Sequence, residues 1–185
     1  MVLSAGARAV CAQAVPAATA RNVSLTAGGM GSIFQPDFAG DWTIATPTYP
    51  VAGASNYPLI GMGAYVDVRL KRWVQFEAEA RWMRFNQYGS IYQDNYLAGP
   101  RLPVYRFGKS TVYGKALAGV STMNFDSFGD HGHFTTFAFG GGLDYRLTRR
   151  ISLRALDVEY QFWPSWGNST VSPYGASVGI GYRVF

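Results

Sequence analysis

The sequence predicts an all-β fold, an eight-stranded antiparallel up-and-down transmembrane β-barrel, and three observations support this prediction. First, 48% of the 185 residues are hydrophobic and only 15% are charged, whereas a soluble domain carries roughly 25–35% charged residues on its surface. Second, no run of 18 or more apolar residues occurs, which excludes an ordinary transmembrane helix. Third, apolar and polar residues alternate with a period of two, as in strands that separate two faces.

Four strands are predicted in the first part of the chain, over about residues 23–34, 58–70, 74–85 and 95–105. The first is rich in glycine and small residues, and the second has a row of aliphatic residues on one face. The third is the clearest, because its apolar positions alternate with polar ones from Gln75 to Arg81. The fourth contains Pro100 and Pro103, and a closed barrel has no edge strand to hold them. We therefore expect a bulge near Gly99-Pro100.

The remaining four strands are predicted over about residues 111–121, 134–147, 151–162 and 173–185. The first two alternate apolar residues with polar residues and glycines. In the third the phase slips, since Ser152 and Arg154 share one face and Asp157 and Glu159 share another. One extra residue near Ala155-Leu156, a β-bulge, would explain the slip. The last strand has one apolar face that continues almost to the C-terminus.

The connections between the predicted strands alternate between long and short. The long segments are Gln35–Tyr57, Asn86–Asp94, Thr122–His133 and Trp163–Ser172, and the short ones centre on Lys71-Arg72, Gly108-Lys109 and Thr148–Arg150. Outer-membrane barrels have short periplasmic turns and longer extracellular loops. Eight strands with both termini on one side give four loops and three turns, which matches the long and short segments here.

The N-terminal residues predict a secretory signal that precedes the barrel. Residues 1–14 end in Ala12-Gln13-Ala14, an A-x-A cleavage signature. Arg8 interrupts the short apolar part, so we expect a signal peptide that is degenerate or truncated. Residues 15–22 are then a short periplasmic segment, and residues 23–185 are the barrel. Cys11 is the only cysteine, which excludes an internal disulfide, and we expect it to leave with the signal.

Three parts of the chain carry a resemblance to a known family. They are Gly140–Tyr145 leading through Arg149-Arg150 to Arg154 and Glu159-Tyr160, the segment Tyr113–Gly119, and the ending Gly179–Phe185. On these segments the chain, from about residue 23 to 185, resembles the small outer-membrane barrels of the OmpA/OmpX transmembrane-domain type, within the outer membrane protein beta-barrel domain family. The resemblance implies a multi-pass protein in the cell outer membrane of a Gram-negative bacterium.

The resemblance also implies how the chain enters the membrane. A C-terminal aromatic residue after alternating apolar residues is similar to the signal that the barrel-insertion machinery reads in that family. Here the candidates are Tyr182, Val184 and Phe185. Tyr182 and Val184 share a face while Phe185 lies on the other, so both Val184 and Phe185 stay open for the terminal role. We expect contacts with outer-membrane lipids and lipopolysaccharide, and a monomer.

Charged residues dominate the predicted inward faces, with six acids and seven bases. This predicted lumen charge network consists of Asp67, Arg69, Glu77, Glu79, Arg81, Arg101, Lys115, Asp144, Arg146, Arg154, Asp157, Glu159 and Arg183. Eight strands leave an interior that side chains alone can fill, and buried charges persist only when they are paired. We therefore predict a lumen that is plugged by salt bridges. Asp144 should lie opposite Arg154 if the turn between them is Thr148–Arg150.

The predicted function is a structural or surface-interaction role, with a possible extracellular partner at residues 35–57, which hold three prolines and, among their aromatic residues, Trp42, Tyr49 and Tyr57. Two alternatives stay open: a narrow porin-like channel for small solutes, and a soluble lipocalin-like barrel that binds a ligand. Aromatic residues near the strand ends favour the membrane, since Trp and Tyr collect at membrane interfaces. They are Trp82, Tyr145, Tyr160, Phe162 and Tyr182.

No motif in the sequence predicts catalysis or a cofactor. His131 and His133 are weak candidates for metal ligands, because two histidines without a defined frame do not make a site. The run Gly140–Gly142 would need a following helix to bind phosphate, and a charged strand follows instead. We also expect no binding of nucleic acid, because several basic residues fall in the short turns rather than on one face. The chain is therefore not expected to be an enzyme.

Overall fold

A computed structural model describes residues 23–36, 58–71, 73–86, 91–125, 130–166 and 169–185. The predicted signal peptide (residues 1–14), the N-terminal segment (15–22) and most of the segment 35–57 lie outside the described residues. The strands are β1 (Ser24–Gln35), β2 (Leu59–Arg69), β3 (Gln75–Met83), β4 (Ile91–Phe107), β5 (Ser110–Phe125), β6 (Asp130–Arg146), β7 (Ile151–Trp166), β8 (Ser169–Val171) and β9 (Tyr174–Arg183). The described part of the chain has no helix that is long and apolar enough to cross a membrane.

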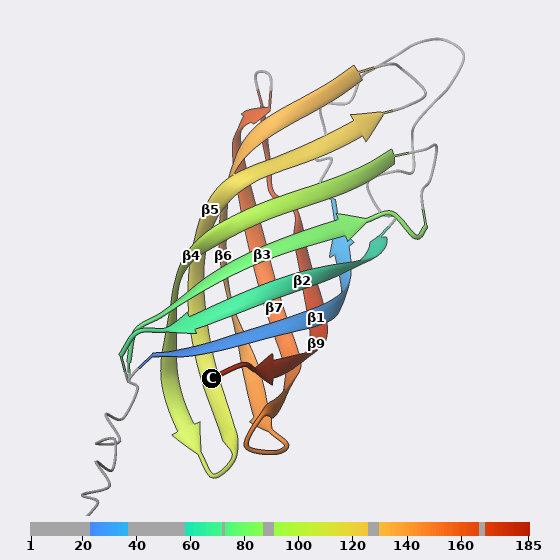
Figure 1. The fold of residues 1–185 in the computed structure, drawn as a ribbon. Coiled ribbons are helices and arrows are strands. Elements are labelled where there is room, and N and C mark those ends of the chain that lie inside the picture. The colour runs from blue at the N-terminus through green and yellow to red at the C-terminus, as the bar shows by residue number, and fades with distance from the viewer. Residues whose placement is uncertain (1–22, 37–57, 72, 87–90, 126–129, 167–168) are drawn as a thin grey trace, which may run out of the picture.

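Eight of these strands form one closed antiparallel barrel, which confirms the predicted fold (Figure 1). Each strand from β1 to β7 pairs with the next, and β9 closes the barrel by pairing with both β7 and β1. The additional strand, β8, is a three-residue extension that pairs only with the outer part of β7. Because closure leaves no edge in the barrel, the ladder hydrogen bonds of all eight strands are satisfied within the wall.

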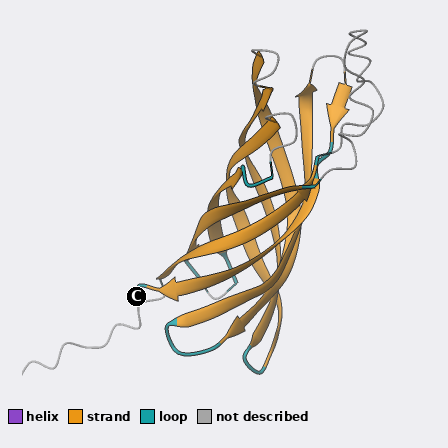
Figure 2. Cartoon of the chain, turned by 90° about the vertical axis from the view of Figure 1, so that its right-hand side faces the viewer, coloured by secondary structure: helices purple, strands orange, loops and turns teal. Residues whose placement is uncertain are grey.

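The three short turns lie at one end of the barrel, together with the C-terminus (Figure 2). The opposite end, which we call the loop end, has longer strands than the sequence predicts. β5 and β6 pair as far as Phe125 and Asp130, so most of the predicted loop 122–133 is strand. The strands are also longer at β4 and β7. The predicted boundaries were too short because the alternation of apolar outward and polar inward residues does not continue into these segments, where Met123 and Trp163 are buried.

The two predicted bulges have different outcomes. In β7 the register shifts between Arg154 and Asp157, so the bulge near Ala155-Leu156 is confirmed. In β4 the bulge predicted near Gly99-Pro100 is wrong, because the register with β5 stays constant there and shifts only between Pro103 and Tyr105. Gly99 and Pro100 instead pair regularly with β3 on the other side of the strand.

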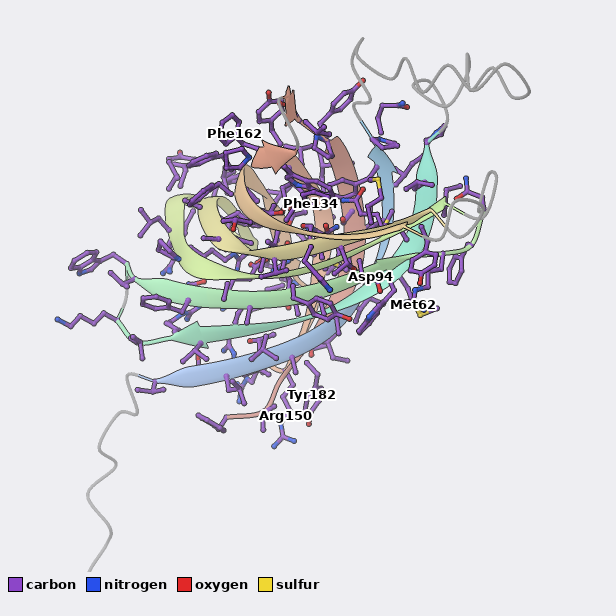
Figure 3. All side chains as sticks on the ribbon, turned by 90° about the horizontal axis from the view of Figure 1, so that it is seen from above. Met62, Asp94, Phe134, Arg150, Phe162 and Tyr182 are labelled. Carbon is purple, nitrogen blue, oxygen red and sulfur yellow. The ribbon has the colours of Figure 1, made fainter. Side chains whose placement is uncertain are left out.

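The barrel has an apolar exterior and a polar interior. Outward side chains such as Phe139, Val178 and Ile180 are each more than half exposed, and the labelled Met62 and Tyr182 point away from the wall (Figure 3). Inward positions hold most of the buried charged residues. The lipocalin-like alternative is therefore wrong, since a soluble barrel with an apolar ligand would have the opposite arrangement.

Candidate functional site

The middle of the lumen holds ten charged side chains that are joined by ion pairs, which we call the lumen network. Its members are the carboxylates of Asp67, Glu77, Glu79, Asp144, Asp157 and Glu159, and the cations of Arg81, Arg101, Lys115 and Arg154. They come from β2, β3, β4, β5, β6 and β7. Strand alternation turns each of them inward, and the bulge in β7 allows Arg154 and Asp157 to share the lumen.

Lys115 lies at the centre of the lumen network. Its Nζ is 2.8 Å from Glu159 Oε2, 3.0 Å from both Glu79 Oε2 and Asp157 Oδ2, and 3.4 Å from Glu77 Oε1. The side chain is fully buried. A buried ammonium is stable only with such compensation, because removing a charge from water is costly unless it is paired and hydrogen-bonded.

Arg154 and Arg101 form the part of the lumen network that is nearer the turns. Arg154 binds Glu77 in a bidentate manner, with both nitrogen–oxygen distances at 2.9 Å. Arg101 bridges Asp67 at 3.0 Å and Asp144 at 2.5 Å. A bidentate guanidinium–carboxylate pair fixes the relative orientation of the two side chains in addition to neutralising their charges. Asp144 is opposite Arg154 in the β6–β7 ladder, as predicted, with a closest approach of 3.8 Å.

Two tyrosines support these arginines, and the sequence analysis did not single them out. The Arg101 guanidinium carbon lies 3.6 Å from the Tyr113 ring centre, and that of Arg154 lies 3.7 Å from the Tyr65 ring centre. Tyr113 also donates a hydrogen bond of 2.8 Å to Asp157. Cation–π contacts therefore support the arginines, while the hydrogen bond of Tyr113 fixes one of the network carboxylates. The available sequence signal was their position, since both tyrosines lie on the predicted inward faces of their strands.

Toward the loop end, Arg81 and a layer of uncharged polar groups complete the interior. Arg81 is fully buried and binds Glu79 and Glu159, each at 2.7 Å. Gln161 donates to Glu159 at 2.8 Å, and its carbonyl accepts a hydrogen bond from Trp163 at 3.1 Å. Beyond this polar layer, Phe34, Leu59 and Met83 pack together as a buried apolar cluster. The sequence analysis missed both layers because it considered only charges in the lumen.

Three of the thirteen predicted lumen residues lie apart from the lumen network. Arg69, Arg146 and Arg183 line a cavity of about 210 Å³ at the end of the barrel that carries the turns, which we call the turn-end cavity. Its basic lining residues are Arg69, Arg101, Arg106, Lys109, Arg146 and Arg183. The sequence analysis did not assign Arg106 or Lys109 to the lumen, because they lie at or in the turn between β4 and β5.

Charge in the lumen is therefore separated along the barrel axis. Six carboxylates against four cations leave the lumen network with a formal excess of two negative charges. The acids of the turn-end cavity, Asp67 and Asp144, already belong to that network. The sequence analysis treated all thirteen residues as one nearly balanced set.

The only group of carboxylates with metal-ligand spacing in the described residues is Glu77, Glu79 and Asp157, whose oxygens lie within 4.8 Å of one another. Lys115 Nζ contacts all three, so its ammonium occupies the position that a cation would take. Of the weak candidates, His133 is exposed and the side chain of His131 lies outside the described ones.

The C-terminal residues continue the ladder beyond β9. Val184 donates a backbone hydrogen bond of 2.8 Å to Leu25, and Leu25 donates one of 3.3 Å to Phe185. Tyr182, Val184 and Phe185 are all about half exposed. Each of the three is thus accessible, and their role as an insertion signal stays a prediction.

Comparison with known proteins identifies relatives of this barrel. A family model described as outer membrane protein beta-barrel domain matches residues 2–183. The fold is similar to that of Neisserial surface protein A, with 11% identity and a TM-score of 0.58 over 87% of this chain and 96% of that one. It is also similar to the N-terminal β-barrel domain of Pseudomonas aeruginosa OprF, with 13% identity and a TM-score of 0.56 over 88% and 98% of the two chains.

A third similar structure is the outer membrane protein OprG from Pseudomonas aeruginosa, with 10% identity and a TM-score of 0.52 over 88% of this chain and 95% of that one. At these identities the three structures are similar in fold alone. A comparison with curated protein sequences gives no match.

Proposed function

This chain belongs to the outer membrane protein beta-barrel domain family, and from that premise we propose that it is a closed, non-conducting barrel with a structural or surface-interaction role. It is an integral protein of the cell outer membrane. The open question is whether its lumen carries solutes. The proposal is that the lumen carries no solutes. It also holds that the protein catalyses no reaction.

The observation that carries the proposal is the position of Lys115 and its four carboxylates. The side chains of Lys115, Glu77 and Asp157 have no exposed surface, and those of Glu79 and Glu159 are 1% exposed. These residues come from three different strands, β3, β5 and β7, so they span the lumen rather than line one side of it. Water is excluded at this level, as is typical of eight-stranded barrels that side chains fill.

An ion that crossed the barrel would have to break several of these pairs at once. The Arg154–Glu77 fork and the Arg101 bridges lie on the turn side of Lys115, and Arg81 lies on its loop side. Breaking a buried pair costs roughly 3–5 kcal/mol, because it leaves an uncompensated charge. Such a barrier supports a closed lumen over a narrow channel.

A surface-interaction role follows if the lumen is closed, since only the ends then face an aqueous phase. The segment 35–57 is the proposed recognition surface because of its length and its aromatic and proline content. Residues 37–57 of this segment lie outside the described residues. Lipids and lipopolysaccharide around the apolar exterior are the other expected partners.

Planar-bilayer recording of the purified, folded protein tests the closed lumen. The wild type should give no steady conductance steps. The double variant Glu77→Ala, Arg154→Ala removes the bidentate pair and should give defined steps. Steady, well-defined steps from the wild type would overturn the proposal and support the channel.

A matched control removes an ion pair outside the lumen network. Arg84 binds Asp94 near the loop end, and the Arg84 side chain is about half exposed. The double variant Arg84→Ala, Asp94→Ala should therefore stay silent in the bilayer. Both double variants are first checked for the change in gel mobility on boiling that folded barrels show, so that conductance is compared only between closed barrels.

A further inference from the structure

We propose that the turn-end cavity is a binding site for a phosphate-class oxyanion. The site borders the lumen network, with which it shares Asp67, Arg101 and Asp144, and it goes beyond the proposed function because a closed barrel does not need it. Its lining includes residues of the β4–β5 turn, and the short turns and the C-terminus lie at the same end of the barrel (Figures 1 and 2). The proposal depends on the charge, the unpaired donors, the size and the hydroxyl lining of this cavity.

The turn-end cavity carries more positive charge than is needed to balance the negative excess of the lumen network. The lumen network has an excess of two negative charges, whereas five basic residues of the cavity are not members of that network. The positive charges of Arg183, Arg106 and Arg101 all act on Arg69, so like charges converge instead of dispersing into solvent. Balancing the lumen network therefore accounts for only part of this cluster, and an anion would relieve the remaining repulsion.

Among the arginines of the cavity that are outside the lumen network, two also have buried donors without an acceptor. Arg69 Nε and Arg183 Nε have almost no exposed surface and no hydrogen-bond partner. Neither residue has a carboxylate within ion-pair distance among the described residues, unlike the arginines of the lumen network. A buried donor without an acceptor is unfavourable. An oxyanion in the cavity would supply acceptors to both strands, β2 and β9.

The size and the remaining lining of the cavity fit such a ligand. On a comparable measure a cavity needs about 10–15 Å³ to hold one water, and this one has about 210 Å³. It therefore has room for a tetrahedral anion with part of an attached group. Hydroxyl groups that can donate to phosphate oxygens line it as well, from Ser24, Thr26, Ser110, Thr111 and Ser152. Arginine forks with hydroxyl donors are the usual protein groups for phosphate recognition.

The ligand has two possible sources, a soluble phosphate compound and the phosphate of an anionic lipid headgroup in the adjacent leaflet. Isothermal titration of inorganic phosphate into the full chain in dodecyl maltoside tests the first. Native mass spectrometry with phosphatidylglycerol against phosphatidylcholine tests the second. The proposal expects saturable binding in at least one of these arms, and the arm that responds identifies the source.

The double variant Arg69→Gln, Arg183→Gln should weaken that binding by about tenfold or more, since each charge-assisted hydrogen bond contributes roughly that factor. The matched control is Arg149→Gln, Arg150→Gln, which removes two charges from an exposed turn outside the cavity. This control should bind as the wild type does. If the first double variant does not fold, Arg146→Gln replaces an exposed cavity side chain and should weaken binding in the same direction.

Two results would overturn the proposal. The wild type could bind neither inorganic phosphate nor phosphatidylglycerol, in which case the cations only balance the negative lumen network. Alternatively, the control and the cavity variant could lose binding equally, which would mean non-specific attraction to a basic surface. Each variant is also checked for the change in gel mobility on boiling. A variant that keeps this change is folded, so its loss of binding cannot be due to unfolding.

Discussion

At the scale of single residues, Lys115 is the cation on which four of the six network carboxylates converge. Arg81 also binds Glu79 and Glu159, and Arg154 also binds Glu77 and Asp157, so without Lys115 two guanidinium groups would have to balance these four carboxylates. The network is therefore sensitive to loss of this one charge, which would increase the repulsion among buried carboxylates.

We accordingly predict that Lys115→Met lowers the free energy of unfolding by about 3–5 kcal/mol, the usual cost of removing one partner from a buried ion pair. Lys109→Met is the matched control, since Lys109 is exposed in the β4–β5 turn, and its effect should be small. Urea titration of both variants in lipid vesicles measures the difference. Equal stability of the two variants would contradict the assigned role of Lys115.

Glycines in the wall make room for the tyrosines that stack on the arginines. A Cβ at Gly28 would lie 2.5 Å from Tyr65 Cζ, whereas a Cβ at Gly31 would have no neighbour within 4 Å. Gly28→Val should therefore displace Tyr65 from Arg154 and cost about 1–3 kcal/mol, as overpacking does. Gly31→Val adds a side chain on the outward face and should be tolerated. Refolding yield in vesicles compares the two, and a greater loss for Gly31→Val would contradict the model of lumen packing.

The sequence predicted the direction of the lumen side chains better than their contacts. Alternation is enough to turn Glu77, Lys115 and Arg154 inward, because the pleat leaves no other choice. Alternation does not show how far neighbouring strands are shifted along the barrel axis. That shift determines that Lys115 reaches four carboxylates, whereas Arg183 lies in a separate cavity. The role of Tyr65 was missed for the same reason, since its partner Arg154 is distant in the sequence and comes close only after closure.

At the scale of elements, the bulge in β7 is the feature that allows one strand to supply three members of the lumen network. Arg154 and Asp157 are both buried although their positions differ by three residues, which is incompatible with a regular strand. The phase slip in the sequence predicted this feature because charged residues occur on both sides of it. The shift in β4 was placed wrongly, since proline alone does not show which of two ladders is interrupted.

Deletion of Ala155 should prevent folding, because it removes the extra residue and forces either Arg154 or Asp157 toward the lipid. An arginine that faces the middle of the membrane costs about 2–4 kcal/mol, and the network would lose its partner as well. Ala155→Gly keeps the number of residues and should fold. The change in gel mobility on boiling reports closure in both cases, and normal folding of the deletion variant would show that the bulge is not required.

At the scale of the whole molecule, the barrel has two unlike ends. The loop end holds a polar layer and the buried cluster of Phe34, Leu59 and Met83, whereas the opposite end has a basic cavity. The sequence predicted which connections share an end, because turn and loop lengths alternate. It could not predict the separation of charge along the axis, which depends on where each strand lies relative to its neighbours.

Orientation in the membrane follows from the lengths of the connections, since outer-membrane barrels keep their short turns in the periplasm. We predict that a cysteine at His133, which is exposed near the loop end, reacts with a membrane-impermeant maleimide on intact cells. A cysteine at Lys109, exposed in the β4–β5 turn, should react only after the outer membrane is permeabilised. The unsubstituted chain serves as the background, because Cys11 is its only cysteine.

The opposite labelling pattern would have consequences beyond topology. If Lys109→Cys reacted on intact cells, the turn-end cavity would face the outside, and a lipid headgroup in the inner leaflet could no longer be its ligand. The segment 35–57 would then be periplasmic and unsuited to an extracellular partner. The expected pattern places the basic cavity next to the periplasm and the recognition surface outside, so one labelling experiment bears on both proposals at once.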